Sequence, residues 1–152
     1  MSNRLRFLFA QSPLIMVLCA TAVAHAQPCS DRTLNGSFGY TVTGSIITPL
    51  GPLVPGPFAA VGRIVFDGEG KVSTVRSLSD DGEVLQNDSG TGTYTLKSDC
   101  TGSFNITVGP PGNDIVLNLN IVFDGNGELR GLVTNSGIVL AFDGRRQEPP
   151  SY

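Results

Sequence analysis

The stretch IVFDGEGKV, from Ile64 to Val72, recurs almost unchanged as IVFDGNGEL from Ile121 to Leu129. In both copies an apolar run ends at Asp-Gly, a second glycine follows, and a new apolar run begins. Glycine readily adopts positive φ angles, which permit the tight reversal that joins two antiparallel strands. Each copy therefore predicts one hairpin corner, and the repeat favours an architecture in which each strand returns beside the last.

Apolar residues alternate with polar ones along most of the chain, which is the period of a strand with one apolar face. In the clearest case, Ile115 to Phe123, five apolar side chains share one face while Asn118 and Asn120 lie on the other. The same alternation, interrupted by Gly, Asp, Asn and Pro, predicts the remaining strands. These are residues 37–43, 58–66, 71–79, 83–87, 91–97, 102–108, 128–134 and 138–142. No stretch after residue 26 shows a helical stripe.

The predicted fold class is all-β: an antiparallel meander closed into a β-barrel of eight strands, or nine if each segment is separate. A closed barrel is favoured over a sandwich because closure removes exposed sheet edges. The single barrel domain is expected to span residues 27–146. Residues 147–152 are polar and rich in proline, so they are expected to form a flexible C-terminal tail.

The first 26 residues have the features of a secretory signal peptide. Arg4 and Arg6 precede an apolar stretch, and Ala24-His25-Ala26 has the small-x-small pattern that signal peptidase accepts. The apolar run is shorter than the roughly 20 residues that span a bilayer. We therefore predict cleavage after Ala26, an exported location, either periplasmic or extracellular, and no membrane association after cleavage.

Loss of residues 1–26 removes the single histidine and leaves eight basic residues against thirteen acidic ones. This acidic balance disfavours nucleic acid, which is bound mainly through Lys and Arg contacts to phosphates. Without histidine there is no Ser-His-Asp triad and no histidine-based zinc site. Asp67 and Asp124 stand at glycine-rich corners without the spacing of calcium ligands, which indicates turns rather than metal sites. The sequence thus predicts no metal and no cofactor, and it identifies no catalytic residue.

Two cysteines remain after cleavage, Cys29 and Cys100. In an exported protein, a pair of cysteines most simply forms one disulfide. Two free thiols are the alternative, although neither thiol has a histidine to activate it as a nucleophile. We predict the Cys29–Cys100 disulfide.

The segment SIITPLGPLVPGPF, from Ser45 to Phe58, differs from the tight turns elsewhere. Its prolines exclude an interior strand, and its aliphatic residues make it too apolar for an ordinary solvated loop. It is expected either to cover a barrel mouth as a lid or to pack against the outer wall. Composition alone does not place a loop, and the outer wall is the favoured interpretation.

Arg63 and Arg76 are the residues on which a ligand hypothesis depends. If DGEG closes the hairpin so that Phe66 pairs with Lys71, both arginines lie on one face of the sheet. On the outer face they would only increase solubility, and this interpretation is favoured because arginine is rarely buried unpaired. Inside the barrel they would need acidic partners or an anionic ligand. The adjacent Asp80 and Asp81, at a glycine turn, are expected to be solvated.

If a ligand binds, its acidic head group is expected on the two arginines and its apolar body on neighbouring valines. Tyrosines could add polar groups to the same cavity, although buried core tyrosines are equally compatible with the sequence. The candidate ligand-binding residues are Arg63, Arg76, Val61, Val65, Tyr40 and Tyr94.

Three motifs, GPFAAVGRIVFDGEGKV, GTYTLKSDCTGS and GRRQ, resemble a group of small exported bacterial proteins of unknown function. Those proteins are similar to the barrel shared by allene oxide cyclases and dirigent proteins. The resemblance implies an eight-stranded antiparallel barrel with an apolar cavity, often trimeric, that guides cyclisation or coupling of a hydrophobic molecule without a cofactor. No catalytic residue of those enzymes matches a position in this chain.

Three functions follow as hypotheses. The first is a binding module for a small apolar or amphipathic ligand, and the second is a cofactor-free isomerase or cyclase. The third is a structural or surface interaction module with a filled barrel. The expected partners are a small hydrophobic ligand and, through the resemblance, further copies of the chain. A structure without a ligand-sized void in the barrel interior would favour the third hypothesis.

Overall fold

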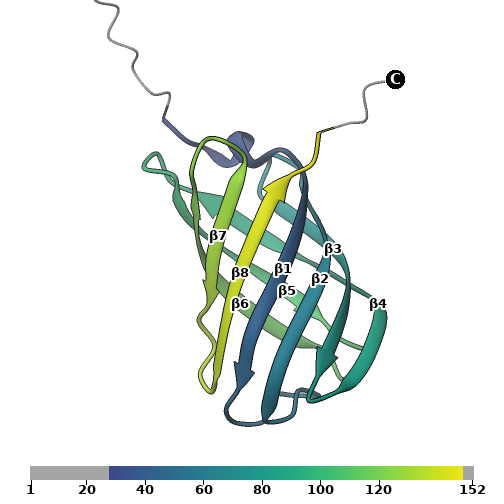
Figure 1. Cartoon of the computed structure of the whole chain (residues 1–152). Helices are drawn as coiled ribbons and strands as arrows, with labels where there is room; N and C mark the ends of the chain where they lie inside the picture. The colour runs from purple at the N-terminus through teal and green to yellow at the C-terminus, as the bar shows by residue number, and fades with distance from the viewer. Residues whose placement is uncertain (1–27, 149–152) are drawn as a thin grey trace, which may run out of the picture.

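The computed structural model describes residues 28–148, and the predicted signal peptide and the end of the predicted tail lie outside the described residues. Eight strands form a closed barrel in which each strand pairs antiparallel with the next and β8 pairs with β1 (Figure 1). The strands are β1 (Gly36–Ile46), β2 (Gly56–Phe66), β3 (Lys71–Asp80), β4 (Glu83–Leu96), β5 (Thr101–Val108), β6 (Ile115–Phe123), β7 (Glu128–Val133) and β8 (Ile138–Arg146). A short 3₁₀ helix, η1 (Asp31–Leu34), precedes β1. The predicted all-β meander barrel is confirmed.

The barrel has eight strands rather than nine because two predicted segments, 83–87 and 91–97, form the single long strand β4. Asn87 lies within β4 with a φ of 58°, and the pairing with β3 shifts between Arg76 and Leu78. An irregularity of this kind bends a strand and re-aims its side chains without ending the ladder. The sequence signal at residues 87–90 therefore marks a bend, not a loop.

The barrel interior is filled mainly by apolar side chains, which alternate inward most regularly along β6. Phe66, the last residue of β2, packs edge-to-face against Phe38, Tyr94 and Phe104 with ring centroids 5.6, 4.9 and 5.9 Å away. Burying one large apolar side chain contributes about 1.5–3 kcal/mol. The buried side chains of the interior therefore stabilise the folded barrel.

Glycines within the strands allow neighbouring strands to approach more closely than any side chain would permit. A Cβ on Gly92 in β4 would overlap the carbonyl oxygen of Asn105 in β5, and one on Gly62 in β2 would lie 2.5 Å from that of Val75 in β3. Glycine in a strand commonly marks such close approach at the bends of a barrel. These positions let a small barrel curve tightly enough to close.

The two copies of the repeated nonapeptide form matching corners, as predicted. Asp67 Oδ1 accepts hydrogen bonds from the backbone N–H groups of Glu69 and Lys71, at 2.7 and 2.9 Å. Asp124 Oδ1 accepts equivalent bonds from Asn126 and Glu128, at 2.8 and 3.0 Å. The hydrogen bond from the N–H of Lys71 has the larger effect and that from Glu69 the smaller one, and both lower the pKa of Asp67 below its ordinary value. The aspartate in the repeat is therefore a turn residue whose carboxylate organises the corner.

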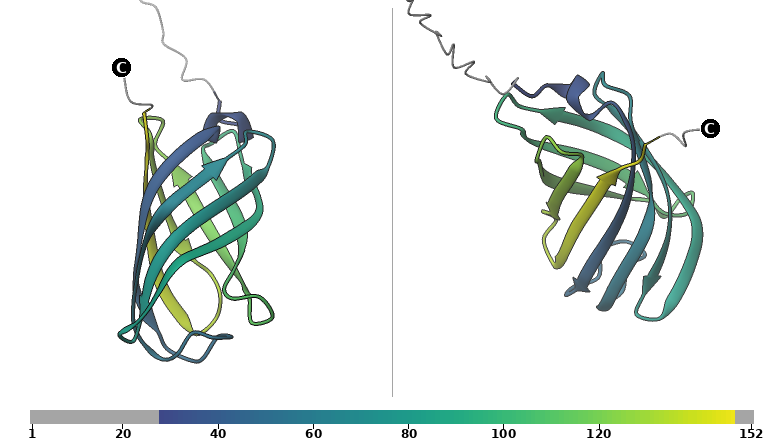
Figure 2. Two further views of the ribbon diagram at one scale, coloured as in Figure 1. Left: turned by 90° about the vertical axis from the view of Figure 1, so that its right-hand side faces the viewer. Right: turned by 45° about the horizontal axis from the view of Figure 1, so that its top comes forward.

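One end of the barrel, called here the sealed end, is covered by the segment from Cys29 to Asn35 (Figure 2). The predicted disulfide joins Cys29 to Cys100 with their Cα atoms 5.1 Å apart. Tyr94 Oη donates to the carbonyl of Asp31 at 2.9 Å, and Asp31 Oδ1 accepts the N–H of Leu96 at 2.6 Å. Burial raises the pKa of the Tyr94 phenol. These contacts hold η1 across the end of the barrel.

Arg146, the last residue of β8, also belongs to the sealed end. Its guanidinium lies over the ring of Phe38, 4.7 Å from the centroid, and near the ring of Phe123 at 5.8 Å. It donates hydrogen bonds to the carbonyl of Thr33, at 2.7 Å, and to that of Asn35. A guanidinium can stack on aromatic faces and donate in its plane at the same time, which a lysine cannot. The final strand is thereby tied to the beginning of the domain.

Candidate functional site

The opposite end of the barrel, called here the mouth, is covered by the connection between β1 and β2 (Figure 1). Leu53 of this connection is 5% exposed and belongs to the core, and Gly51 contacts the side chain of Ile115 so closely that a Cβ would overlap it. The N–H of Val54 donates to Asp80 Oδ2 at 2.9 Å. The favoured expectation that this segment packs on the outer wall is wrong. The apolar rim of the mouth gives Leu53 a burial site that the outer wall lacks.

Inside the barrel the remaining void is small, about 30 Å³. It lies among inward side chains that include Tyr40, Thr74, Arg76 and Phe142. A cavity of this volume has room for one or two water molecules. Pockets for drug-sized ligands measure about 300–1,000 Å³. The barrel interior is therefore a packed core, which favours the hypothesis of a filled-barrel module over that of a ligand held inside the barrel.

Towards the mouth the core becomes polar and contains a buried ion pair. Arg76 Nε lies 2.8 Å from Asp88 Oδ2, and the two side chains are 6% and 3% exposed. Asp88 Oδ1 accepts the N–H of Gly109 at 3.1 Å. An ion pair out of water is tolerated only when it is close and its remaining polar atoms are bonded. Asp88 meets both conditions, so it is the partner that allows Arg76 to face inward.

A second polar group lies beside this pair. Tyr40 Oη donates to Thr74 Oγ1 at 2.8 Å, and Thr74 Oγ1 donates to the carbonyl of Arg63 at 3.0 Å. Desolvation raises the pKa of Tyr40, and the Thr74 bond and the charge of Arg76 offset part of that rise. The ring of Tyr40 stacks on Phe142 with centroids 5.1 Å apart. Tyr40 therefore acts as a satisfied core residue.

Asp80 at the end of β3 differs from these groups because one of its oxygens has no partner. The residue is 7% exposed, and Oδ2 accepts the Val54 N–H. Within residues 28–148, Oδ1 is the one fully buried side-chain oxygen or nitrogen without a hydrogen bond. Both Asp80 and Asp81 were expected to be solvated. This expectation is wrong for Asp80, because its position in β3 directs the side chain inward, and it is confirmed for Asp81, which is exposed. Buried polar atoms without partners are rare and costly.

Asp80 lines a pocket of about 200 Å³ at the mouth, called here the mouth pocket. The β1–β2 connection, the β3–β4 hairpin and the β5–β6 turn form its walls. Apolar side chains predominate, and the polar groups converge from β3 and β4. Its main lining residues are Leu53, Arg76, Leu78, Asp80, Leu85, Asp88 and Ile115. A concave apolar site with a few converging polar groups is the usual form of a small-molecule site.

The structure does not bring the predicted ligand-binding residues together. Phe66 pairs with Val72 rather than Lys71, because the corner contains one residue more than the predicted turn. The shift places Arg63 opposite Val75, on the outer surface, while Arg76 points inward. A one-residue change of register reverses the face of every side chain on a strand.

The other predicted ligand-binding residues also lie on opposite faces of the barrel wall. Val61 and Val65 face outward, whereas Tyr40 and Tyr94 face into the barrel. Tyr94 lies at the sealed end, where its hydroxyl bonds to Asp31. Of the predicted set, only Arg76 lines the mouth pocket. Alternation counted forwards from the buried Val72 places both Arg76 and Asp80 inside the barrel, once the register is known.

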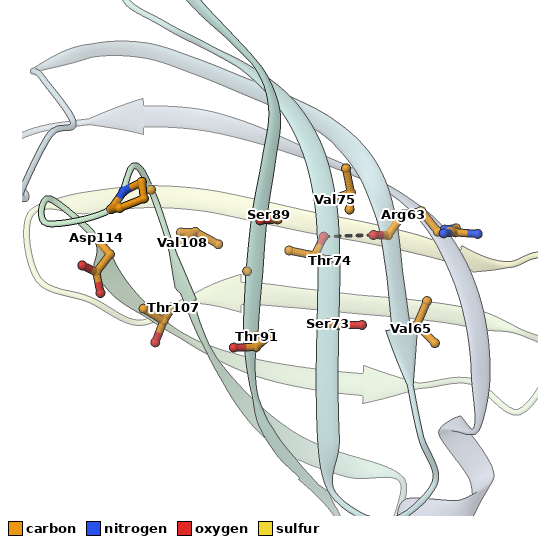
Figure 3. A pocket seen from close by; sticks show the side chains of 13 residues that line it. Arg63, Val65, Ser73, Thr74, Val75, Ser89, Thr91, Thr107, Val108 and Asp114 are labelled. Carbon is orange, nitrogen blue, oxygen red and sulfur yellow. Dashed lines mark hydrogen bonds between the residues drawn. The ribbon is translucent and has the colours of Figure 1, made fainter.

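A larger depression of about 460 Å³ lies on the outer wall over β2 to β5 (Figure 3). Arg63 and Asp114 stand at its two ends, and hydroxyl side chains such as Ser73 and Thr91 lie between them. The atoms that face solvent there keep water as a partner. Because the buried unpaired oxygen lies at the mouth instead, the mouth pocket is the better candidate site.

Two further observations concern the described residues alone. In residues 28–148, no group of three or more His, Cys, Asp or Glu side chains is arranged to hold a metal ion. Over the same span, no helix has the length and hydrophobicity to cross a membrane.

Comparison with known proteins supports the fold alone. No protein-family model matches the chain, and no curated protein is similar to it. A solved structure of a redesigned β-barrel is similar over 78% of this chain and 95% of its own, with a TM-score of 0.55 and 21% identity. The chain thus has the architecture of a small closed β-barrel.

Proposed function

We propose that this protein is an exported binding protein that holds a small amphipathic molecule in the mouth pocket, beneath the β1–β2 connection. One observation carries the proposal: an apolar pocket of about 200 Å³ is lined by Asp80, whose Oδ1 is buried and has no hydrogen-bond partner. A hydrogen-bond donor on a ligand would satisfy that oxygen, and the body of the ligand would lie against Leu53, Leu85 and Ile115.

The proposal places the ligand outside the packed interior and includes no catalytic step. An interior void of about 30 Å³ has no room for the substrate of a cyclase. An isomerase would also need groups that stabilise a transition state more strongly than the substrate. The inward polar groups near that void, Tyr40 and Thr74, are already bonded to each other. We therefore do not extend the resemblance to allene oxide cyclases to their activity.

Export is part of the proposal and rests on two features. Residues 1–26 have the pattern of a signal peptide. The Cys29–Cys100 disulfide fits an oxidising compartment such as the periplasm or the extracellular space. Expression with the full leader, followed by N-terminal sequencing of the exported product, would test cleavage after Ala26. Full-length protein that stays reduced inside the cell would contradict export.

Binding is tested by NMR titration of residues 27–152 with short-chain amines, alcohols and acids. We expect saturable shifts at Leu53, Leu85 and Gly109, which surround the mouth pocket. Leu85→Ser removes one exposed pocket wall, and Val139→Ser removes a similarly exposed aliphatic from the outer wall of β8. Loss of the apolar contact should weaken binding about tenfold in Leu85→Ser, whereas Val139→Ser should bind like the wild type. If no compound shifts these residues, the filled-barrel interaction module is the better description.

A further inference from the structure

We propose that the head group bound in the mouth pocket is a cation, specifically the ammonium group of a small organic amine, and that it donates to Asp80 Oδ1. The inference rests on the proposed function and specifies the chemical class of the ligand. It reverses the prediction from the sequence, in which two arginines would hold an acidic head group.

The first argument concerns the bonding state of the three buried charged groups that line the pocket, Arg76, Asp80 and Asp88. Arg76 is already paired with Asp88 at 2.8 Å. Asp80 has only the Val54 N–H on Oδ2, and its Oδ1 is buried with no partner. An ammonium group would supply a charge-assisted hydrogen bond to that oxygen, which is stronger than a neutral one. A carboxylate ligand would instead bring a second acidic oxygen to Oδ1 and no hydrogen-bond donor.

The second argument is the charge of the pocket lining. Three acidic residues, Asp80, Glu83 and Asp88, and one basic residue, Arg76, line the mouth pocket. Because Arg76 is paired with Asp88, the lining keeps an excess of acidic residues. A cleft with an excess of one sign of charge attracts ligands of the opposite sign.

The third argument is the shape and lining of the pocket, which favour an organic cation over a metal ion. Its walls are mainly aliphatic side chains such as Leu53, Leu78 and Ile115. No group of three or more acidic, histidine or cysteine side chains in residues 28–148 could hold a metal. A volume of about 200 Å³ is below the roughly 300 Å³ at which drug-sized pockets begin. The fitting ligand is therefore a primary amine with a short alkyl chain or a single ring.

The test compares three probes of similar length, hexylamine, hexanol and hexanoate, at pH 7 by NMR titration of residues 27–152. We expect hexylamine to bind at least tenfold more tightly than hexanol and hexanoate to bind most weakly. Asp80→Asn keeps the shape of the side chain and should remove the preference for the amine while leaving hexanol binding. The matched control is Asp81→Asn, next to it and exposed, which should retain the preference.

Each result separates this inference from the proposed function. Equal binding of the three probes, or a preference for hexanoate, would overturn the cationic head group and leave the mouth pocket as a binding site. No shift with any probe would overturn both. If Asp80→Asn does not fold, the order of the probes on the wild-type protein decides. Hexyltrimethylammonium then completes the test: it has the charge but no N–H donor, and binding as tight as that of hexylamine would overturn the hydrogen bond to Oδ1.

Discussion

The two ends of the barrel are closed by different kinds of contact. At the sealed end, η1 is held by a disulfide, by the aromatic and carbonyl contacts of Arg146, and by hydrogen bonds to Asp31. At the mouth, the β1–β2 connection is held by the buried Leu53, by backbone hydrogen bonds to Gly137 and by one hydrogen bond to Asp80. Within the part of the chain that the structure describes, no covalent link or cation–π contact holds this connection, which lies above a buried ion pair. Departures from good packing and full polar satisfaction concentrate at functional sites. The sealed end thus supplies stability, which lets the mouth keep an unpaired buried oxygen.

The largest expected effect comes from breaking the ion pair at the mouth. Arg76→Met removes one partner and leaves the carboxylate of Asp88 buried and uncompensated. We expect the free energy of unfolding, measured in urea, to fall by about 3–5 kcal/mol. The double variant Arg76→Met/Asp88→Asn removes both charges and keeps an acceptor for the Gly109 N–H, so it should regain most of that loss. Equal stability of the two variants would show that the pair is not electrostatically coupled.

The next effect concerns the disulfide of the sealed end. Cys29→Ser/Cys100→Ser should lower the free energy of unfolding by about 2–4 kcal/mol, because the open chain gains entropy when it unfolds. The barrel should remain folded, since the interior is unchanged. Reduction of the wild-type protein with dithiothreitol provides the control and should produce a similar loss. A change below about 0.5 kcal/mol, the usual range for surface substitutions, would mean that the other contacts hold η1 without the disulfide.

A smaller effect is expected from Arg146→Lys. Lysine keeps the charge but cannot both stack on Phe38 and donate in the plane of a guanidinium to two carbonyls. The loss should be about 1–2 kcal/mol by urea unfolding. The neighbouring Arg145 is exposed and provides the matched control, since Arg145→Lys should change stability by less than about 0.5 kcal/mol. Equal effects of the two variants would remove Arg146 from the set of sealing contacts.

The smallest effect concerns the corner at Asp67 and depends on pH. Its folded-state pKa is lowered, so the ionised carboxylate stabilises the folded state above the ordinary aspartate pKa of about 3.9. That contribution is lost as the pH falls through the lower, folded-state value. Asp67→Asn should therefore be slightly less stable than the wild type at pH 7 and equally stable at pH 2. Parallel stability curves of the two proteins would contradict this assignment.

The fold was predictable from the sequence because its signals are local. Alternation in Ile115–Phe123 places five side chains in the core, and the Asp-Gly-x-Gly repeat identifies two corners by a bonding pattern contained within five residues. The disulfide followed from the number of cysteines and the expected compartment. Among the predicted strands, the division of β4 into two was wrong, because a bend at Asn87 resembles a turn in sequence.

The site was not predictable to the same degree because it depends on register. The sequence does not show whether the corner after Phe66 contains four residues or five, and this single residue decides which arginine enters the barrel. The place of the β1–β2 connection depends on a rim assembled from β3, β4 and β6, which are distant in sequence. Asp80 appeared to be an ordinary turn residue because the sequence does not show this rim.

The hydrogen bond between Arg146 and Thr33 joins residues 113 positions apart in the sequence. A contact between such distant residues affects the order in which the barrel folds. The ring closes only when β8 reaches β1, so the pairing with the greatest sequence separation depends on the last strand of the domain. Such non-local pairings slow folding, to about milliseconds to seconds in all-β domains. Until that step, β1 and β7 present open edges that can pair with other chains. A chain truncated before β8 should therefore aggregate rather than form a smaller barrel, and refolding yield should fall as protein concentration rises.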